Sequence, residues 1–156
     1  MATQHPYRAT IKWTGNKGEG TTNYRAYERG HIVSIENKSD ILGSADPAFR
    51  GDRTKHNPED LLISSLSACH MLWYLHLCAE AGIVVMDYLD NATGTMTETA
   101  NGGGRFTEVV LNPSVTITDG SMIDKANELH IKANELCFIA NSVNFPVRHQ
   151  PITIAK

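Results

Sequence analysis

The chain has 156 residues, of which 41% are hydrophobic and 20% are charged, and its formal net charge is −3 at pH 7. This composition is typical of a globular protein with a single domain over residues 1–156 that is long enough to bury a core. The lack of a basic excess argues against nucleic acid as the main partner, and the first residues lack the apolar core of a secretory signal, so we expect a cytoplasmic protein.

The first predicted elements are strands. From Tyr7 to Trp13 apolar and polar residues alternate, which is the period of two expected for a strand with one buried face. Residues 31–36 form a second candidate strand. Residues 15–23 and 45–56 are polar and contain Gly or Pro, so we expect loops there.

A long helix is predicted over residues 58–81. Asn57 is a suitable N-cap, proline is favoured at the first helical position, and Gly82 is a suitable C-cap. Residues 61–79 contain no Asp, Glu, Lys or Arg, yet they include serines and histidines that are costly in lipid. We therefore expect a helix buried inside a protein and not a membrane span.

Strands are expected again after this helix. Residues 83–100 are rich in Val and Thr and are predicted as one long strand with a bend near Asp90. The Asn-Gly-Gly-Gly sequence at 101–104 is a turn signal that joins it to residues 105–119. Residues 151–155 could close the sheet.

A second helix is predicted from Ser121 to about Cys137. Ser121 and Asp124 have the spacing of a capping box, and apolar residues follow at helical spacing. Strands and helices therefore come in blocks along the chain, not in strict alternation. This order predicts an α+β fold.

Three cysteines are an odd number, which excludes a fully paired disulfide framework. Cys69 and Cys78 are nine residues apart on one predicted helix and face opposite sides, so an intramolecular disulfide must use Cys137. A free cysteine is usually a buried small hydrophobe, and an apolar helix interior raises the pKa of a thiol. A reactive Cys69 would therefore need a nearby cation. The segments before the helix offer three arginines: Arg25, Arg29 and Arg50.

Other clusters in the sequence have weaker chemistry. His70 and His76 are six residues apart, which is a poor ligand spacing, and His130 with Cys137 is more often packing than ligation, so we expect no metal site. The glycines at 102–104 form a hairpin turn and not a phosphate loop, so we expect no bound cofactor.

Two segments, Asn57-Pro58-Glu59-Asp60-Leu61-Leu62 and Ala68-Cys69-His70, followed by residues 134–142, resemble the OsmC/Ohr family of osmotically inducible and organic hydroperoxide resistance proteins. The resemblance implies antiparallel sheets wrapped around a long buried central helix and a second helix. It also implies an intertwined homodimer with its sites at the subunit interface.

The resemblance further implies a thiol-dependent peroxidase that reduces organic hydroperoxides in oxidative stress defence. Cys69 matches the peroxidatic cysteine and Cys137 the resolving cysteine, and Glu59 matches the family's site glutamate. Arg29 is the best match for the site arginine that pairs with the thiolate, with Arg25 and Arg50 as alternatives. The implied reductant is a dithiol such as a lipoyl group on a partner protein.

The sequence departs from the better-studied branches of the family in several places. His70 stands where those branches tend to have Phe, Phe138 begins an unusual continuation after Cys137, and Cys78 has no counterpart in the family's mechanism. The alternative is therefore a non-catalytic OsmC-like protein that binds a small apolar ligand or a partner and uses its thiols for packing.

Overall fold

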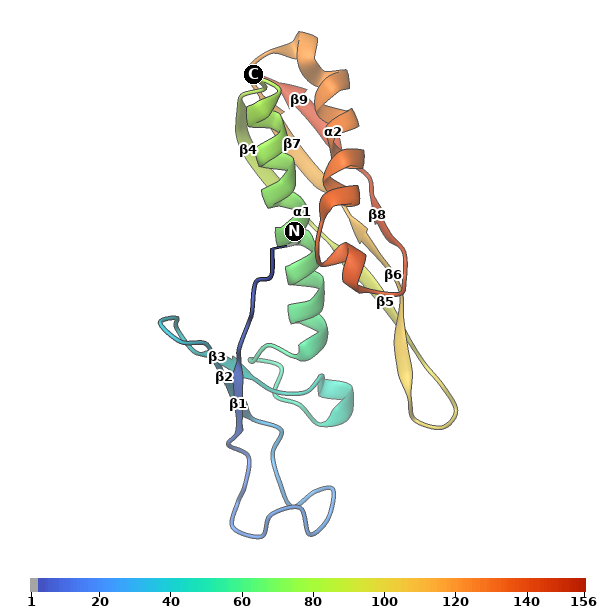
Figure 1. The fold of residues 1–156 in the computed structure, drawn as a ribbon. Coiled ribbons are helices and arrows are strands. Elements are labelled where there is room, and N and C mark those ends of the chain that lie inside the picture. The colour runs from blue at the N-terminus through green and yellow to red at the C-terminus, as the bar shows by residue number, and fades with distance from the viewer. Residues whose placement is uncertain (1–2) are drawn as a thin grey trace. The chain divides into compact units, whose positions relative to one another are not determined.

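The computed structural model describes residues 3–156 (Figure 1). The chain divides into two compact units, Met1–Leu61 and Leu62–Lys156. The units contain sheets and two α-helices, so the predicted α+β class is confirmed. The single domain over residues 1–156 stays a prediction, because this division does not test whether either unit folds alone.

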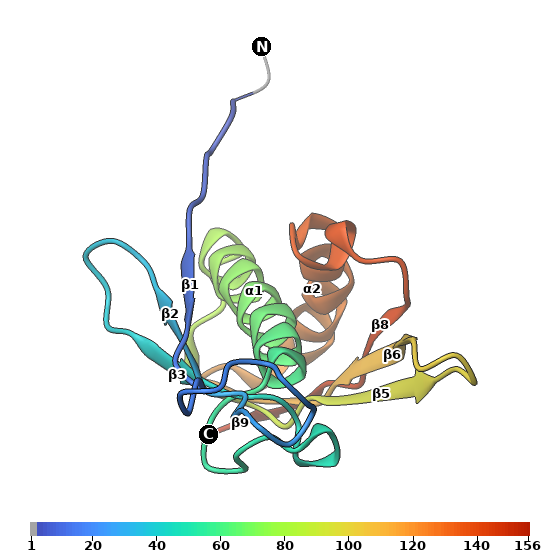
Figure 2. The ribbon, with the colours of Figure 1, turned by 90° about the horizontal axis from the view of Figure 1, so that it is seen from below.

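The first unit contains a three-stranded antiparallel sheet in the order β1-β2-β3. Its strands are β1 (Thr10–Trp13), β2 (His31–Ser34) and β3 (Ile41–Gly43), and Figure 2 shows them side by side. β1 and β2 lie where the alternation predicted strands. β3 was not predicted, because three residues are too few to produce a recognisable period.

Helix α1 (Pro58–Glu80) confirms the predicted long helix. Asn57 Oδ1 accepts a hydrogen bond from the Asp60 N–H at 2.7 Å, and the Asn57 N–H donates to Asp60 Oδ2 at 3.2 Å, so the two residues cap the helix reciprocally. Gly82, with a φ of +73°, follows its end. By length and a mean hydropathy of 1.4, α1 could cross a membrane, a property that core helices of globular proteins share.

The second unit contains two three-stranded sheets, with strand orders β4-β7-β9 and β5-β6-β8. The strands are β4 (Val85–Asp90), β5 (Thr93–Glu98), β6 (Gly104–Leu111), β7 (Pro113–Ile117), β8 (Val147–His149) and β9 (Ile152–Ala155). The β6–β8 and β7–β9 pairs are parallel. The sheets are therefore mixed, where the resemblance implied antiparallel ones.

The single strand expected over residues 83–100 is wrong, because the chain changes sheet between β4 and β5. Asp90 at the end of β4 accepts hydrogen bonds from the Ser67 hydroxyl at 2.5 Å and from the Asn112 N–H at 2.7 Å. Asn112 is the residue at which the returning chain passes from β6 to β7. One carboxylate thus fixes both points where the chain leaves one sheet for the other.

Helix α2 (Ile123–Leu136) confirms the second predicted helix, but the predicted capping box of Ser121 and Asp124 is wrong. The carboxylate of Asp119 instead accepts hydrogen bonds from the Ser121 N–H at 2.9 Å and from its hydroxyl at 2.7 Å. These bonds hold a 3₁₀ turn, Gly120–Met122, immediately before α2. Within the second unit α2 lies alongside α1 and runs in the opposite direction (Figures 1 and 2).

The core of the second unit lies between the helices and the sheets. Only one face of α1 is buried, formed by residues at a spacing of four: Leu66, His70, Tyr74 and Cys78. Tyr74 and Cys78 pack with α2 and with β7, and Leu66 packs with β6. A spacing of four keeps these side chains on one side of the helix. The rest of α1 is therefore less buried in this chain than the predicted buried helix.

Three histidines lie together in this core. His70 of α1 and His130 of α2 are 1% and 0% exposed, and His70 Nε2 lies 2.9 Å from His130 Nδ1. The ring of Tyr74 stacks on that of His130 with centroids 3.8 Å apart, and the His149 ring lies 5.6 Å from that of His70. Burial lowers the pKa of His70 to about 4 and that of His130 to about 3, with a smaller contribution from neighbouring imidazoles.

These shifts predict that the fold loses stability in mild acid. An unfolded histidine takes up a proton as the pH falls through 6.5, whereas the folded chain resists protonation down to about pH 4 or 3. The stabilisation is therefore complete above pH 6.5 and is lost as the pH falls. At about pH 5 we expect a loss of about 2 kcal/mol per histidine, measured by urea unfolding against about pH 7.5.

The variant His130→Asn removes one titrating group and keeps an amide at the same place. We expect it to lose roughly half as much stability between the two pH values as the parent. Equal losses in the two proteins would show that these imidazoles are not the source of the acid sensitivity.

Candidate functional site

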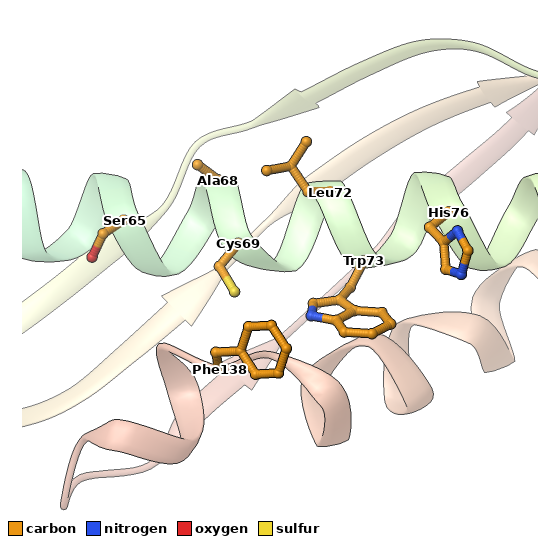
Figure 3. Close-up of a pocket in the computed structure, with 7 residues that line it drawn as sticks. All are labelled: Ser65, Ala68, Cys69, Leu72, Trp73, His76 and Phe138. Carbon is orange, nitrogen blue, oxygen red and sulfur yellow. The ribbon is translucent and has the colours of Figure 1, made fainter. Parts of the chain in front are cut away.

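A cavity of about 600 Å³ opens on the second unit (Figure 3). Seven residues line it: Ser65, Ala68, Cys69, Leu72, Trp73, His76 and Phe138. None of these side chains carries a permanent charge, and the surface that they expose to the cavity is mostly carbon. The cavity is therefore suited to the apolar part of a small organic molecule.

Cys69 is half-buried and its sulfur points across the cavity toward the side where Phe138 lies (Figure 3). Helical geometry places Cys69 about 100° from His70, so it lies beside the buried face of α1 and not on it. The Trp73 ring meets Phe138 edge to face with centroids 5.7 Å apart, and it meets His76 at 5.8 Å. The thiol thus opens into a space with aromatic walls.

Cys137 follows the last residue of α2 and is 1% exposed. Its sulfur accepts a hydrogen bond from the Ala140 N–H at 3.4 Å. Burial raises the pKa of Cys137 to about 11, and the neighbouring Cys69 thiol adds to this effect, while the Ala140 N–H opposes it. The structure therefore brings Cys69 and Cys137 together, both as free thiols, with Cys137 protonated at neutral pH.

The segment after Cys137 is held to the end of α2 by Asn141. Its side-chain amide donates to the carbonyl of Glu135 at 2.8 Å and to that of Cys137 at 3.0 Å, and its N–H also donates to the Cys137 carbonyl. These bonds satisfy carbonyls that the end of a helix leaves unpaired. Sequence reasoning missed this role, although an asparagine shortly after a helix is a recognised stop signal.

Cys78 lies in the core and not at the cavity. It is 0% exposed and packs with Tyr74, and burial raises the pKa of its thiol. This position is that of a structural cysteine, which is inert as long as it stays buried.

Arg29 and Glu59 lie together in the first unit, where both line a cavity of about 330 Å³. The Arg29 guanidinium donates to the carbonyls of Tyr27 at 2.6 Å and Tyr24 at 2.8 Å. It also lies over both tyrosine rings, at 4.3 and 4.2 Å from their centroids. These contacts hold the cation in one orientation through hydrogen bonds and cation–π attraction.

The other two candidate arginines lie outside the cavity that Arg29 and Glu59 line. Neither Arg25 nor Arg50 lines the cavity, and Arg50 has a φ of +66° at the end of a 3₁₀ turn. Within residues 3–156 no ion pair within 4.0 Å joins Arg29 to Glu59, so that contact stays a prediction. The two thiols thus lie together in the second unit, whereas Arg29 and Glu59 share a cavity of the first unit without an ion pair between them.

The histidine cluster does not have the geometry of a metal site. In the described part of the chain no three His, Cys, Asp or Glu side chains are placed to hold one ion. The His70 and His130 rings lie within 7° of parallel, with centroids 5.2 Å apart and nitrogens 2.9 Å apart, which places them edge to edge. The two nitrogens point at each other as hydrogen-bond partners.

The comparisons with known proteins agree with this architecture. Residues 51–151 match the family described as OsmC-like protein. An OsmC-like protein of unknown function from Vibrio cholerae is 32% identical, with a TM-score of 0.86 over 96% of this chain and 100% of that chain. The search of curated proteins found no match.

Two more distant structures share the fold. An organic hydroperoxide resistance protein from Elizabethkingia anophelis is 22% identical, with a TM-score of 0.71 over 100% of both chains. Another from Legionella pneumophila is 17% identical, with a TM-score of 0.71 over 99% of this chain and 100% of that chain. The family match covers well over half of the sequence, and the chain therefore belongs to the OsmC-like family.

Proposed function

We propose that the protein is a cysteine-based peroxidase that reduces organic hydroperoxides. The observation that carries the proposal is that the partly exposed Cys69 opens into an apolar cavity while the buried Cys137 lies beside it. A peroxidatic thiol must be reachable by substrate, whereas a resolving thiol needs only to reach the first sulfur. The two cysteines meet these opposite requirements.

In the first step the Cys69 thiolate attacks the outer oxygen of the hydroperoxide, and the O–O bond breaks. The sulfur becomes a sulfenic acid, and the departing alkoxide takes up a proton to leave as an alcohol. The apolar and aromatic walls, including Trp73 and Phe138, hold the organic part of the substrate near the sulfur. The sulfur is oxidised by two electrons and the peroxide is reduced by two.

In the second step Cys137 attacks the Cys69 sulfenic acid, a disulfide forms and water leaves. The high pKa of Cys137, about 11, keeps this thiol protonated and therefore unreactive toward peroxide. Its reaction partner in this step is the sulfenic acid of Cys69. Its proton leaves with the hydroxyl group as water. A dithiol reductant, for which we propose a lipoyl group on a partner protein, then restores both thiols by exchange.

Arg29 and Glu59 complete the site in this proposal. A thiolate in an apolar wall needs an opposite charge, and an arginine keeps its charge when partly buried. The carbonyls and rings that contact Arg29 fix the orientation of its guanidinium. Glu59, which lines the same cavity, can accept hydrogen bonds from the remaining N–H groups of Arg29.

We further propose a cytoplasmic homodimer with its sites at the subunit interface. Leu72 of α1 and Phe138, both in the cavity wall, are 63% and 71% exposed. A partner subunit over these side chains would exclude water from the peroxide and from the sulfenic acid.

The thiol chemistry predicts a stoichiometry. One equivalent of cumene hydroperoxide per chain is expected to remove two of the three free thiols, and Cys69→Ser to abolish this loss. Free thiols are counted by titration, and the disulfide is located by peptide mass. Cys78→Ser is the matched control and should still lose two thiols.

Unchanged thiols in the native protein would contradict the peroxidase. That result would favour a non-catalytic protein that uses the same cavity to bind a small apolar ligand, because the cavity wall is almost entirely carbon.

The assignment of Arg29 predicts a large difference among the arginines. Arg29→Gln is expected to slow the reaction of Cys69 with peroxide by about 10- to 1000-fold at neutral pH, because a nearby cation lowers a thiol pKa by about 1–3 units. Arg25→Gln and Arg50→Gln are the controls and should react within about twofold of the parent. Stopped-flow kinetics with cumene hydroperoxide gives the rates, and an equal loss in all three variants would overturn the assignment.

A further inference from the structure

The buried imidazole pair of His70 and His130 has no role in the proposed chemistry. The two nitrogens that face each other, His70 Nε2 and His130 Nδ1, are 2.9 Å apart. The opposite nitrogen of each ring, His70 Nδ1 and His130 Nε2, is buried without a hydrogen-bond partner. A neutral imidazole carries one donor and one acceptor, so the pair always leaves one donor and one acceptor unpaired.

Packing alone does not account for such a pair. Unpaired polar atoms are unfavourable in a protein interior, and two apolar side chains of similar volume would fill this space without them. The other buried residues of α2 are indeed apolar, namely Ala126, Leu129 and Ala133. The feature that an apolar pair could not supply is the directed bond itself.

This bond joins α1, which carries Cys69, to α2, which Cys137 immediately follows. Within residues 3–156 it is the single side-chain hydrogen bond between α1 and α2. Apolar contacts are non-directional and tolerate small shifts of one helix along the other, whereas a linear hydrogen bond between two rings does not.

The position of the bond relative to the thiols follows from helical spacing. Cys69 immediately precedes His70 on α1, and Cys137 follows His130 by seven residues, about two turns, at the end of α2. The His70–His130 hydrogen bond and the contact between Cys69 and Cys137 thus involve the same stretch of α1 and the C-terminal part of α2. Disulfide formation needs Cβ atoms about 3.8 Å apart, so a shift of α2 by one residue, about 1.5 Å, would separate the sulfurs.

We propose that the His70–His130 hydrogen bond is a positioning element that holds α2 in the register at which Cys137 reaches the sulfur of Cys69. The two histidines touch neither the substrate nor the reacting atoms. Their function is to make the second step of the cycle fast, and the inference rests on the proposed function for the step it serves.

Disulfide formation by diamide tests this without any peroxide. Diamide takes two electrons and two hydrogens from Cys69 and Cys137, and the Cys78→Ser background leaves only these two thiols. We expect His130→Leu to slow disulfide formation by about tenfold or more, since small misplacements of reacting groups cost this much or more. Alkylation of Cys69 by iodoacetamide, which needs no second thiol, should stay within about twofold.

A matched pair of amides separates positioning from packing. Asn places its amide where His130 has Nδ1, whereas Gln extends it by one bond, so His130→Asn should keep the parent rate and His130→Gln should lose it. The same comparison decides the question if His130→Leu fails to fold, and the exposed His5→Gln serves as the unchanged control.

Equal disulfide rates in folded His130→Asn, His130→Gln and parent protein would overturn the inference. A native protein that fails to react with hydroperoxides but shows the expected diamide rates would overturn the proposed peroxidase and leave the positioning role intact.

Discussion

The arrangement of the second unit depends on the burial of one face of α1. Residues at a spacing of four, from Leu66 to Cys78, pack against α2 and the sheets, and this packing fixes the rotation of the helix about its axis. Successive residues on a helix are about 100° apart, so burying His70 places Cys69 beside the core and not inside it. The same rotation turns Trp73 and His76 to the cavity. A reactive thiol is thus placed by the packing of its neighbours.

Local signals in the sequence were sufficient for the helices. The Asn57 cap and Gly82 give the ends of α1, because capping depends on the residues that immediately flank a helix. The change of sheet after Asp90 could not be predicted, since it depends on a hydrogen bond to Asn112, twenty-two residues away. β8 was missed for the same reason, as it is three residues long and gains its definition by pairing with β6. Elements defined by long-range pairing are invisible to a search for local periods.

The functional site likewise contains residues that sequence motifs indicated and contacts that depend on the folded structure. The resemblance selected Cys69 and Cys137 through motifs that spacing alone would not have separated from ordinary buried cysteines. The contact between His70 and His130 joins residues sixty positions apart, and nothing local in the sequence indicated it. A histidine on an apolar stripe is usually read as a satisfied core residue. Here His70 Nδ1 and His130 Nε2 are recognised as unpaired only in the folded structure, where the two helices pack together.

The proposed peroxidase chemistry requires a positive charge that the residues lining the Cys69 cavity do not supply. The walls of that cavity contain no lysine or arginine. The two largest influences on the pKa of Cys137, its burial and the Cys69 thiol, both raise it. A Cys137 thiolate in such surroundings is unfavourable, so Cys137 by itself is an inert thiol. Arg29 is the candidate that the fold has already oriented, because two carbonyls and two tyrosine rings hold its guanidinium without a carboxylate neutralising it within 4.0 Å in the described part of the chain. An oriented cation whose charge no carboxylate neutralises is the kind of group that the proposed peroxidatic thiolate requires.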